Sequence, residues 1–154
     1  MKKVIAVASN GGHWVQLLRL LPALQPEDIN ISLDFISTEE INVIYQGNSF
    51  RSHVVTDCNF SESKRKILPC LFQCCRIVNK IKPDVVVSTG AAPGLLTIFV
   101  ARLCGAKTIW IDSIANSRKL SLSGRVAKYI ASVCLTQWPE LADGKRVMHV
   151  GSVV

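Results

Sequence analysis

The sequence predicts a single α/β domain, residues 1–154, in which a parallel sheet lies between two layers of helices. Short apolar runs alternate with longer segments of helical periodicity, from Val4–Ala8 at the start to Met148–Val150 at the end. Polar turns that contain glycine follow several of these runs, as at Ser9–Gly12 and Ser88–Gly94. In a parallel sheet such turns meet at the carboxyl edge of the strands, where ligands bind.

The bulk composition narrows the class of protein. No apolar run approaches the roughly 20 residues that span a bilayer, and no signal-peptide pattern is present, so we expect a cytoplasmic protein. The net charge of +7 favours an anionic partner, either a phosphorylated substrate or an anionic membrane surface. Because the basic residues are scattered and no nucleic-acid-binding motif is present, we expect no nucleic acid partner.

The cysteine and glycine patterns give no sign of a metal or a cofactor. The six cysteines lie mostly inside apolar patterns and form no C-x-x-C pair. The dinucleotide fingerprint G-x-G-x-x-G is absent as well. We therefore expect neither a bound metal nor a cofactor.

In the N-terminal part, Val4–Ala8 and Ile31–Ser37 are expected to be strands, and Ser52–Thr56 a weaker third one. The segment Trp14–Leu24 has helical spacing and is apolar nearly all round. Such a helix is either buried against the sheet or covered by a partner or a membrane, and the pattern leaves both open. The segment Thr38–Tyr45 is expected to be a short helix or a loop.

The remaining elements follow the same alternation. The basic run Lys64–Lys66 is either a solvated helix start or, near a phosphate or lipid head group, a site that attracts anions. We expect helices at Ile67–Lys82, Leu95–Cys104 and Ser121–Ser132, and strands at Val85–Val87, Thr108–Ile111, Val133–Thr136 and Met148–Val150.

Three turns are expected to converge on the carboxyl rim of the sheet: Asn10–His13, Gly90–Gly94 and Asp112–Lys119. A strand, a glycine turn and a helix in that order form an anion site, because free N–H groups and the helix dipole favour negative charge. The alternative is that Gly11-Gly12 only makes a tight turn. We predict a phosphate or sugar-phosphate near His13. The candidate binding residues are Asn10, Gly11, Gly12, Gly90, Ala91, Gly94, Ser113 and Asn116.

These motifs together resemble a known family. Ser9–His13 followed by Gln16-Leu17, and then Ser88–Gly94, are similar to the Alg14-type proteins, which include bacterial capsule and exopolysaccharide proteins of the PssD and CpsF kind. The most specific matches, in order and spacing, are Ile109–Ala115, Leu120–Gly124 and Gln137–Leu141, and the closing Val150–Val153 also fits. The resemblance covers nearly the whole chain.

The resemblance implies the N-terminal, Rossmann-like half of a GT-B glycosyltransferase that is split across two polypeptides. This half would face a polyprenyl-diphosphate-linked acceptor at the membrane. A separate Alg13-like, PssE-type subunit would carry most of the site for a nucleotide sugar, with UDP as the expected nucleotide. The enzyme would then be a hexosyl- or glucuronosyltransferase of capsule or exopolysaccharide synthesis, peripheral on the inner face of the cytoplasmic membrane. The donor sugar stays open.

Within that reading, His13 and Asp112 are the candidate catalytic residues. His13 is the candidate base, because histidine exchanges protons near neutral pH, and the alternative is a side chain that only bonds the turn. Asp112 would orient His13, act as the base itself, bind acceptor hydroxyls, or simply cap its loop. Trp138 and Glu140 are expected near the junction with the partner. Two other functions stay open: a non-catalytic scaffold that recruits a catalytic partner, and a stand-alone nucleotide-binding protein.

Overall fold

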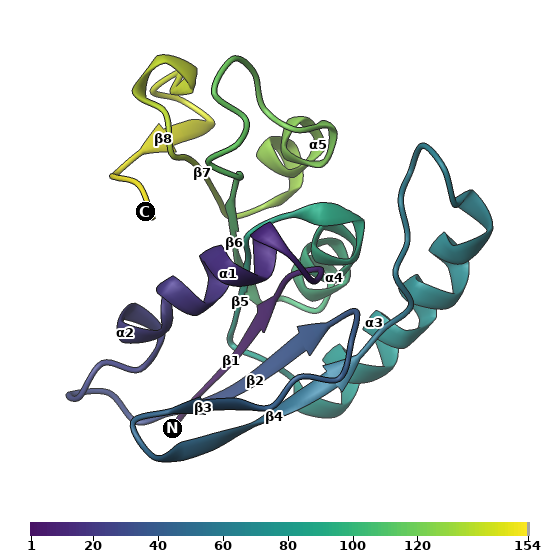
Figure 1. Ribbon diagram of the computed structural model, residues 1–154, viewed down its shortest axis with the longest axis vertical. Coiled ribbons are helices and arrows are strands. Elements are labelled where there is room, and N and C mark those ends of the chain that lie inside the picture. The colour runs from purple at the N-terminus through teal and green to yellow at the C-terminus, as the bar shows by residue number, and fades with distance from the viewer. Residues whose placement is uncertain (154) are drawn as a thin grey trace.

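The computed structural model describes residues 1–153, and within them eight strands form one sheet in the order β3-β4-β2-β1-β5-β6-β7-β8 (Figure 1). The strands are β1 (Lys2–Val7), β2 (Ile31–Ser37), β3 (Val43–Tyr45), β4 (Asn48–Val54), β5 (Val85–Ser88), β6 (Lys107–Ile111), β7 (Val133–Thr136) and β8 (Val147–His149). All neighbouring strands are parallel except β3 and β4. The expected parallel α/β sheet is confirmed.

The expectation of a helix or loop at Thr38–Tyr45 is wrong in part, because its end forms the edge strand β3. This strand pairs antiparallel with β4, so that Tyr45 faces Asn48 across a two-residue turn. Both turn residues, Gln46 and Gly47, have positive φ, of 50° and 77°. That geometry matches the right-handed twist of a hairpin. The Gln-Gly pair is a weaker turn signal than Asn-Gly, and the hairpin also starts β4 earlier than expected.

Two helical layers cover the sheet. Helices α1 (Gly12–Arg19) and α2 (Leu21–Leu24) lie on one face, and α3 (Ile67–Ile81), α4 (Ala91–Leu103) and α5 (Leu122–Ile130) lie on the other (Figure 1). Two short 3-10 turns, η1 (Lys64–Lys66) and η2 (Pro139–Leu141), complete the elements. No helix within residues 1–153 is both long enough and apolar enough to cross a bilayer.

The first helical segment lies against the sheet, which answers the question its sequence left open. Trp14 and Leu17 are buried, and the Trp14 ring meets Phe35 of β2 edge-on at 5.7 Å between centroids. The segment is also two helices rather than one, because Pro22 starts a new first turn after Leu20. Packing against the sheet therefore accounts for Trp14 and Leu17, whereas Val15 on the outer side of α1 stays exposed.

Two other helices differ from expectation at their ends. Helix α4 starts at Ala91, four residues early, because the small residues Ala91–Gly94 form its first turn. Helix α5 is shorter than expected, and its N-cap is Ser121, whose Oγ accepts a hydrogen bond from Gly124 N at 2.8 Å.

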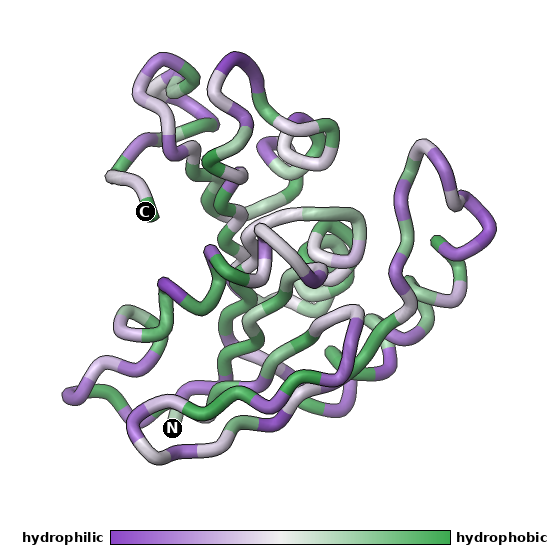
Figure 2. Tube along the Cα trace, in the orientation of Figure 1, coloured by the Kyte–Doolittle hydropathy of each residue, from purple (hydrophilic) through white to green (hydrophobic). Residues whose placement is uncertain are grey.

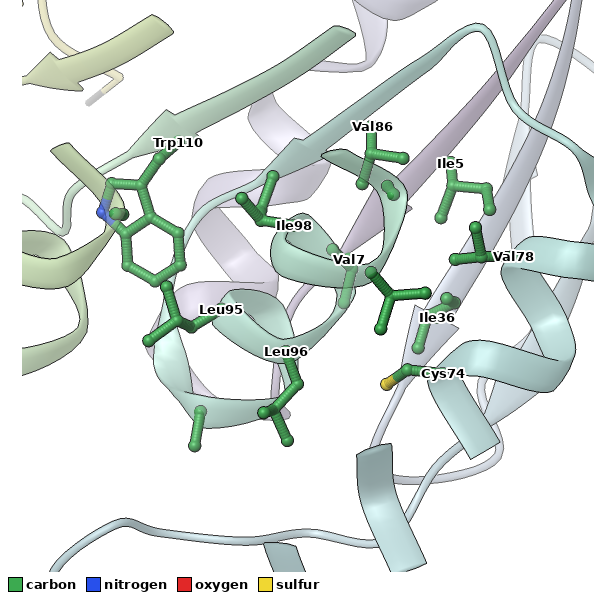
Figure 3. Packing of buried hydrophobic residues seen from close by; sticks show 14 of the residues in the cluster. Ile5, Val7, Ile36, Cys74, Val78, Val86, Leu95, Leu96, Ile98 and Trp110 are labelled. Carbon is green, nitrogen blue, oxygen red and sulfur yellow. The ribbon is translucent and has the colours of Figure 1, made fainter. Parts of the chain in front are cut away.

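The larger core lies between the sheet and the layer of α3, α4 and α5. Strand residues such as Ile5 and Val86 belong to one cluster with Ile98 of α4 and with Val78 of α3, which lies beside Ile5 in Figure 3. The hydropathy colouring shows the same arrangement, with apolar strands inside and polar loops at the edges (Figure 2). A second core lies under α1 and α2 on the opposite face. With both faces covered, the central strands read as continuous apolar runs rather than alternating ones.

The strand order places the candidate site. From β1 the chain moves to β2 on one side, and later returns to β5 on the other side of β1. The turns after β1 and β5 therefore lie next to each other at the point where the order reverses. In doubly wound sheets, ligands bind in the crevice at this switch point.

Truncating a buried side chain of α4 tests this packing. We expect Ile98→Ala, at a fully buried position, to lower the free energy of unfolding by about 2–4 kcal/mol because it leaves a cavity. The matched control is Ile44→Ala on β3, where the side chain is 70% exposed and the loss is expected below about 0.5 kcal/mol. Urea unfolding followed by circular dichroism measures both. Equal losses would contradict the assigned core.

Candidate functional site

A cleft of about 860 Å³ opens at the carboxyl edge of the sheet. Its walls are the loops after β1, β4, β5 and β6 together with the starts of α4 and α5. The predicted site residues that line it are His13, Ala91, Ser113 and Asn116. The rim predicted from the three turns is therefore a real concave surface.

His13 is held by two hydrogen bonds to Thr89. Its Nδ1 lies 2.9 Å from the Thr89 carbonyl oxygen, and Thr89 Oγ1 donates to the His13 carbonyl oxygen at 2.7 Å. A carbonyl oxygen only accepts hydrogen bonds, so Nδ1 carries the proton. In the neutral ring Nε2 then has a free lone pair. Because His13 lines the cleft, Nε2 is the nitrogen of this ring that is left to accept a proton.

Gly90 is required by the position of that ring. A Cβ at Gly90 would overlap the His13 imidazole, and the φ of Gly90 is +141°. Gly94 is similar, because a Cβ there would overlap Ser88 Oγ. At both candidate binding glycines, the absence of a Cβ therefore makes room for a side chain of the protein itself, His13 at Gly90 and Ser88 at Gly94.

The first turn of α4 faces the cleft through Ala91 and Ala92. Its N-cap, Gly90, makes no side-chain cap hydrogen bond, and the turn contains no acidic residue. The leading N–H groups and the helix dipole therefore favour an anion. Lys66, Lys119 and Arg125 add positive charge along the walls of the same cleft, where they outnumber the two carboxylates, Asp57 and Glu62.

Asp112 is buried beneath the loop that follows β6, with 1% of its surface exposed. Its carboxylate accepts hydrogen bonds from Trp110 Nε1 at 3.1 Å, Asn116 Nδ2 at 3.3 Å, Ser121 N at 2.9 Å and Ser121 Oγ at 2.6 Å. A Cβ at Gly124 would come within 2.5 Å of it. No hydrogen bond joins it to His13 within residues 1–153. The carboxylate therefore closes the loop from β6 to α5.

The remaining predicted residues lie outside the cleft walls. Asn10 is exposed and donates from Nδ2 to Glu39 Oε2 at 2.7 Å, and Gly11-Gly12 are exposed beside it. Trp138 donates from Nε1 to the Ile114 carbonyl oxygen at 2.7 Å, and Glu140 is exposed on η2. Asn10, Gly11 and Gly12, which were expected to bind the phosphate, therefore do not line the cleft, and Trp138 and Glu140 were expected near the partner rather than in it.

Several lining residues were not predicted. The segment Asp57–Ser63 forms one wall, with Phe60 half-buried, and Arg125 stands on another, beside Lys119 at the end of the predicted turn Asp112–Lys119. The segment has no hydrophobic periodicity, and only the position of β4 beside β2 brings it to the rim. The basic run at Lys64–Lys66 was the one available signal, and Lys66 lines the cleft.

The buried cysteines behave as core residues. Among residues 1–153, no three His, Cys, Asp or Glu side chains are grouped so as to hold a metal ion. Burial, helped by the nearby Asp112 carboxylate, raises the pKa of Cys134 to about 12, and burial also raises the pKa of Cys58. These thiols stay neutral and behave as small core residues.

Sequence relatives share one description. The chain is 25% identical to "UDP-N-acetylglucosamine transferase subunit ALG14" of Yarrowia lipolytica, covering 92% of this chain and 76% of that protein. It is 22% identical to the human protein of the same name, over 98% of this chain and 82% of that one. A "UDP-N-acetylglucosamine--N-acetylmuramyl-(pentapeptide) pyrophosphoryl-undecaprenol N-acetylglucosamine transferase" of Lachnospira eligens is 26% identical over 96% of this chain and 45% of that protein.

Solved structures show the fold. Acinetobacter baumannii MurG superposes with a TM-score of 0.76 at 18% identity, over 99% of this chain and 46% of that one. The UDP-GlcNAc 2-epimerase of Methanocaldococcus jannaschii gives 0.66 at 17% identity, with the same two coverages. The chain thus spans about half the length of these structures, as expected for one Rossmann-like half of the GT-B fold.

The family model described as "Oligosaccharide biosynthesis protein Alg14 like" matches residues 4–153, almost the whole chain. The cleft at the switch point, the fold and the order of the motifs agree with that match. The chain belongs to the Alg14 family.

Proposed function

We propose that this chain, residues 1–154, is the acceptor-side domain of a two-chain glycosyltransferase. It would bind a polyprenyl-diphosphate-linked acceptor and receive a sugar from a nucleotide sugar, UDP-linked, held mainly by an Alg13-like, PssE-type partner. The observation that carries the proposal is the cleft that places a free imidazole nitrogen beside an anion-binding surface. The family and the names of its relatives support the reaction class.

The chemistry requires a proton acceptor and charge stabilisation. The acceptor hydroxyl oxygen attacks the anomeric carbon of the donor, a new C–O bond forms, and the bond from that carbon to the nucleotide diphosphate breaks. We assign the departing hydroxyl proton to Nε2 of His13, because Nδ1 is occupied by the Thr89 carbonyl oxygen. Ser113 and Asn116 stand on the cleft wall where polar groups of the acceptor would bind.

The anionic part of the acceptor explains the rest of the cleft. A diphosphate carries negative charge, and the free N–H groups of α4 with Lys66, Lys119 and Arg125 surround a site that favours it. Among the predicted turn residues, we assign diphosphate binding to Ala91, because it is the first residue of α4 and lines the cleft.

We assign Asp112 a positioning role. Its carboxylate is buried and already accepts four hydrogen bonds from its own loop and from Trp110, so it has little capacity left for a substrate. Its burial is tolerated because the charge is satisfied by those donors. By fixing Ser121 and Asn116, it shapes the wall on which Ser113 and Asn116 stand.

We place the partner subunit beside Trp138 and Glu140. Both follow β7 at the end of the sheet distant from β3, and Glu140 is free to face another chain. Trp138 links this region to the cleft through the Ile114 carbonyl oxygen. The acceptor is assigned to capsule or exopolysaccharide synthesis on the sequence resemblance. The names of the relatives put UDP-N-acetylglucosamine first among the donors to test.

We also propose that the layer of α3, α4 and α5 rests on the inner face of the cytoplasmic membrane. Exposed apolar side chains recur there at four-residue spacing, hence on one side of each helix. They are Leu68 and Phe72 on α3, Phe99 and Leu103 on α4, and Leu122 and Val126 on α5. Between Lys64 and Pro139 the only acidic residues are Asp84 and Asp112, which suits an anionic leaflet.

A transfer assay tests the central proposal. Membranes that supply lipid-linked acceptor are mixed with labelled UDP-sugars and with this chain, the partner subunit, or both. We expect transfer only with both chains, and one donor of the panel to be used. Transfer by this chain alone would contradict the two-chain proposal, and tight dinucleotide binding by this chain alone would favour a stand-alone nucleotide-binding protein.

The role of His13 is tested in the same assay. We expect His13→Ala to lower kcat by about 10²- to 10⁴-fold, the usual contribution of a general base, while complex formation persists. The matched control is His149→Ala, whose Nδ1 also lies near a backbone carbonyl oxygen, that of Thr136 at 3.1 Å, but outside the cleft. A full-rate His13→Ala enzyme would instead favour the non-catalytic scaffold.

The role of Asp112 is tested by stability. We expect Asp112→Asn to lower the free energy of unfolding by about 1–3 kcal/mol, because an amide NH₂ would face donors that need an acceptor. Asp57→Asn is the control, since this exposed carboxylate lines the same cleft and should change stability by less than about 0.5 kcal/mol. Chemical denaturation measures both. Unchanged stability with lost transfer would make Asp112 the base.

The membrane surface is tested with vesicles. We expect the wild-type chain to sediment with phosphatidylglycerol vesicles and not with neutral phosphatidylcholine ones. Phe72→Glu, at a side chain that is 71% exposed, should weaken binding by about tenfold, because it removes apolar contact and adds negative charge. Ile44→Glu on the distant edge strand is the control and should bind as wild type. Equal loss in both variants would exclude this surface.

A further inference from the structure

Two buried glutamines connect the cleft loop to the end of the chain. Gln16, on α1, is 7% exposed, and Gln137, just after β7, is 4% exposed. Gln137 Nε2 donates to Gln16 Oε1 at 2.7 Å, although the two residues are 121 positions apart in sequence. Neither residue lines the cleft, and the proposed reaction uses neither.

In each glutamine, both Oε1 and Nε2 form further hydrogen bonds. Gln137 Oε1 accepts from Val153 N at 2.8 Å, and its Nε2 also donates to the Asp112 carbonyl oxygen at 3.0 Å. Gln16 Oε1 also accepts from Ile114 N at 3.2 Å, and its Nε2 donates to Ser113 Oγ at 3.1 Å.

The orientation of both side chains follows from their backbone partners. An N–H only donates and a carbonyl oxygen only accepts, so reversing the amide of Gln137 would set NH₂ against the Val153 N–H. Reversing Gln16 would likewise set NH₂ against the N–H of Ile114. The hydrogen bonds therefore form one directed series of donors, from Val153 N through Gln137 and Gln16 to Ser113 Oγ, and Ile114 N donates into it at Gln16 Oε1.

The series ends on the cleft. Ser113 lines it, and Ser113 Oγ also accepts from Ala115 N at 3.3 Å, so the Gln16 amide supports the turn that presents Ser113 and Ala115 to the cleft. At the other end, Val153 is held two residues after Gly151, which has a φ of +135°. Trp138 adds a parallel link to the Ile114 carbonyl oxygen.

We propose that Gln16 and Gln137 are positioning residues that keep the cleft loop Asp112–Asn116 in register with the C-terminal segment Gly151–Val153. Buried amides left without partners are costly, so a displacement of the segment favours rearrangement of the loop. Resting on the proposed function, the same series transmits the docking of the partner subunit near Trp138 to the acceptor side of the cleft.

Amide hydrogen exchange of the full chain, followed by NMR, tests the series without any substrate. In Gln137→Leu we expect exchange at Ile114 and Ala115 to rise by about tenfold or more, because their acceptors lose support, while β1 and β5 keep their rates. The control is Gln25→Leu, since Gln25 Nε2 is buried with no hydrogen-bond partner within residues 1–153. Unchanged exchange at Ile114 and Ala115 would overturn the proposal.

A second variant keeps both glutamines in place. Val153→Pro removes the N–H that donates a hydrogen bond to Gln137 Oε1. It should therefore raise amide exchange at Ile114 and Ala115. Ser152→Pro is its control, because the Ser152 N–H donates no hydrogen bond within residues 1–153. If Gln137→Leu does not fold, the two proline variants decide whether the loop depends on the C-terminal segment. Equal effects of the two proline variants, or none, would overturn the link to the C-terminal segment.

The transfer assay with both chains gives the functional measurement. We expect Gln137→Leu and Val153→Pro to raise the KM for the lipid-linked acceptor by about tenfold and to leave the KM for the donor unchanged. An equal rise in both KM values would overturn the positioning role. If the wild-type pair shows no transfer, the proposed function fails, and the exchange experiment still decides the series.

Discussion

The pair of hydrogen bonds between His13 and Thr89 is the constraint on which the cleft depends. It joins the start of α1 to the end of β5, at the point where the strand order reverses. Thr89 is fully buried, so its hydroxyl and carbonyl groups need these partners. The same bonds set the tautomer of His13 and leave no room for a side chain at Gly90. The same two hydrogen bonds therefore set the position of the His13 ring, its tautomer and the backbone geometry at Gly90.

Around that fixed point, buried polar groups rather than apolar packing shape the cleft. The Asp112 carboxylate closes the loop after β6, and the Gln16 and Gln137 amides support its underside. A buried polar network is stable only when every member is satisfied, which makes it specific to one loop conformation. Binding residues on a loop gain precision in this way from the rigid sheet beneath.

The two helical layers have different surfaces. Helices α1 and α2 bury their apolar residues against the sheet, whereas α3, α4 and α5 fill the larger core and still expose apolar and basic residues outward. Lys66, Leu122 and Arg125 belong to that outer layer and also line the cleft. A lipid-linked acceptor bound at the proposed membrane surface would thus have its anionic head beside the anion-binding wall.

The sequence by itself determined the parallel α/β fold, the positions of most strands and the three turns at the rim. Apolar runs and glycine turns are local signals, and a buried parallel sheet needs both. His13, Ala91, Ser113 and Asn116 were found in this way, and all line the cleft. The β3–β4 hairpin was missed, because its Gln46-Gly47 turn is a weak local signal.

Only the tertiary structure decided how far-apart residues meet. The wall Asp57–Ser63 reaches the cleft because β4 pairs with β2, and the Gln16–Gln137 pair forms because α1 and the end of β7 approach the same loop. It also decided that Asp112 is enclosed by its own loop and that Gly90 makes room for His13. Contacts of this kind depend on distances between elements, which no local pattern of residues encodes.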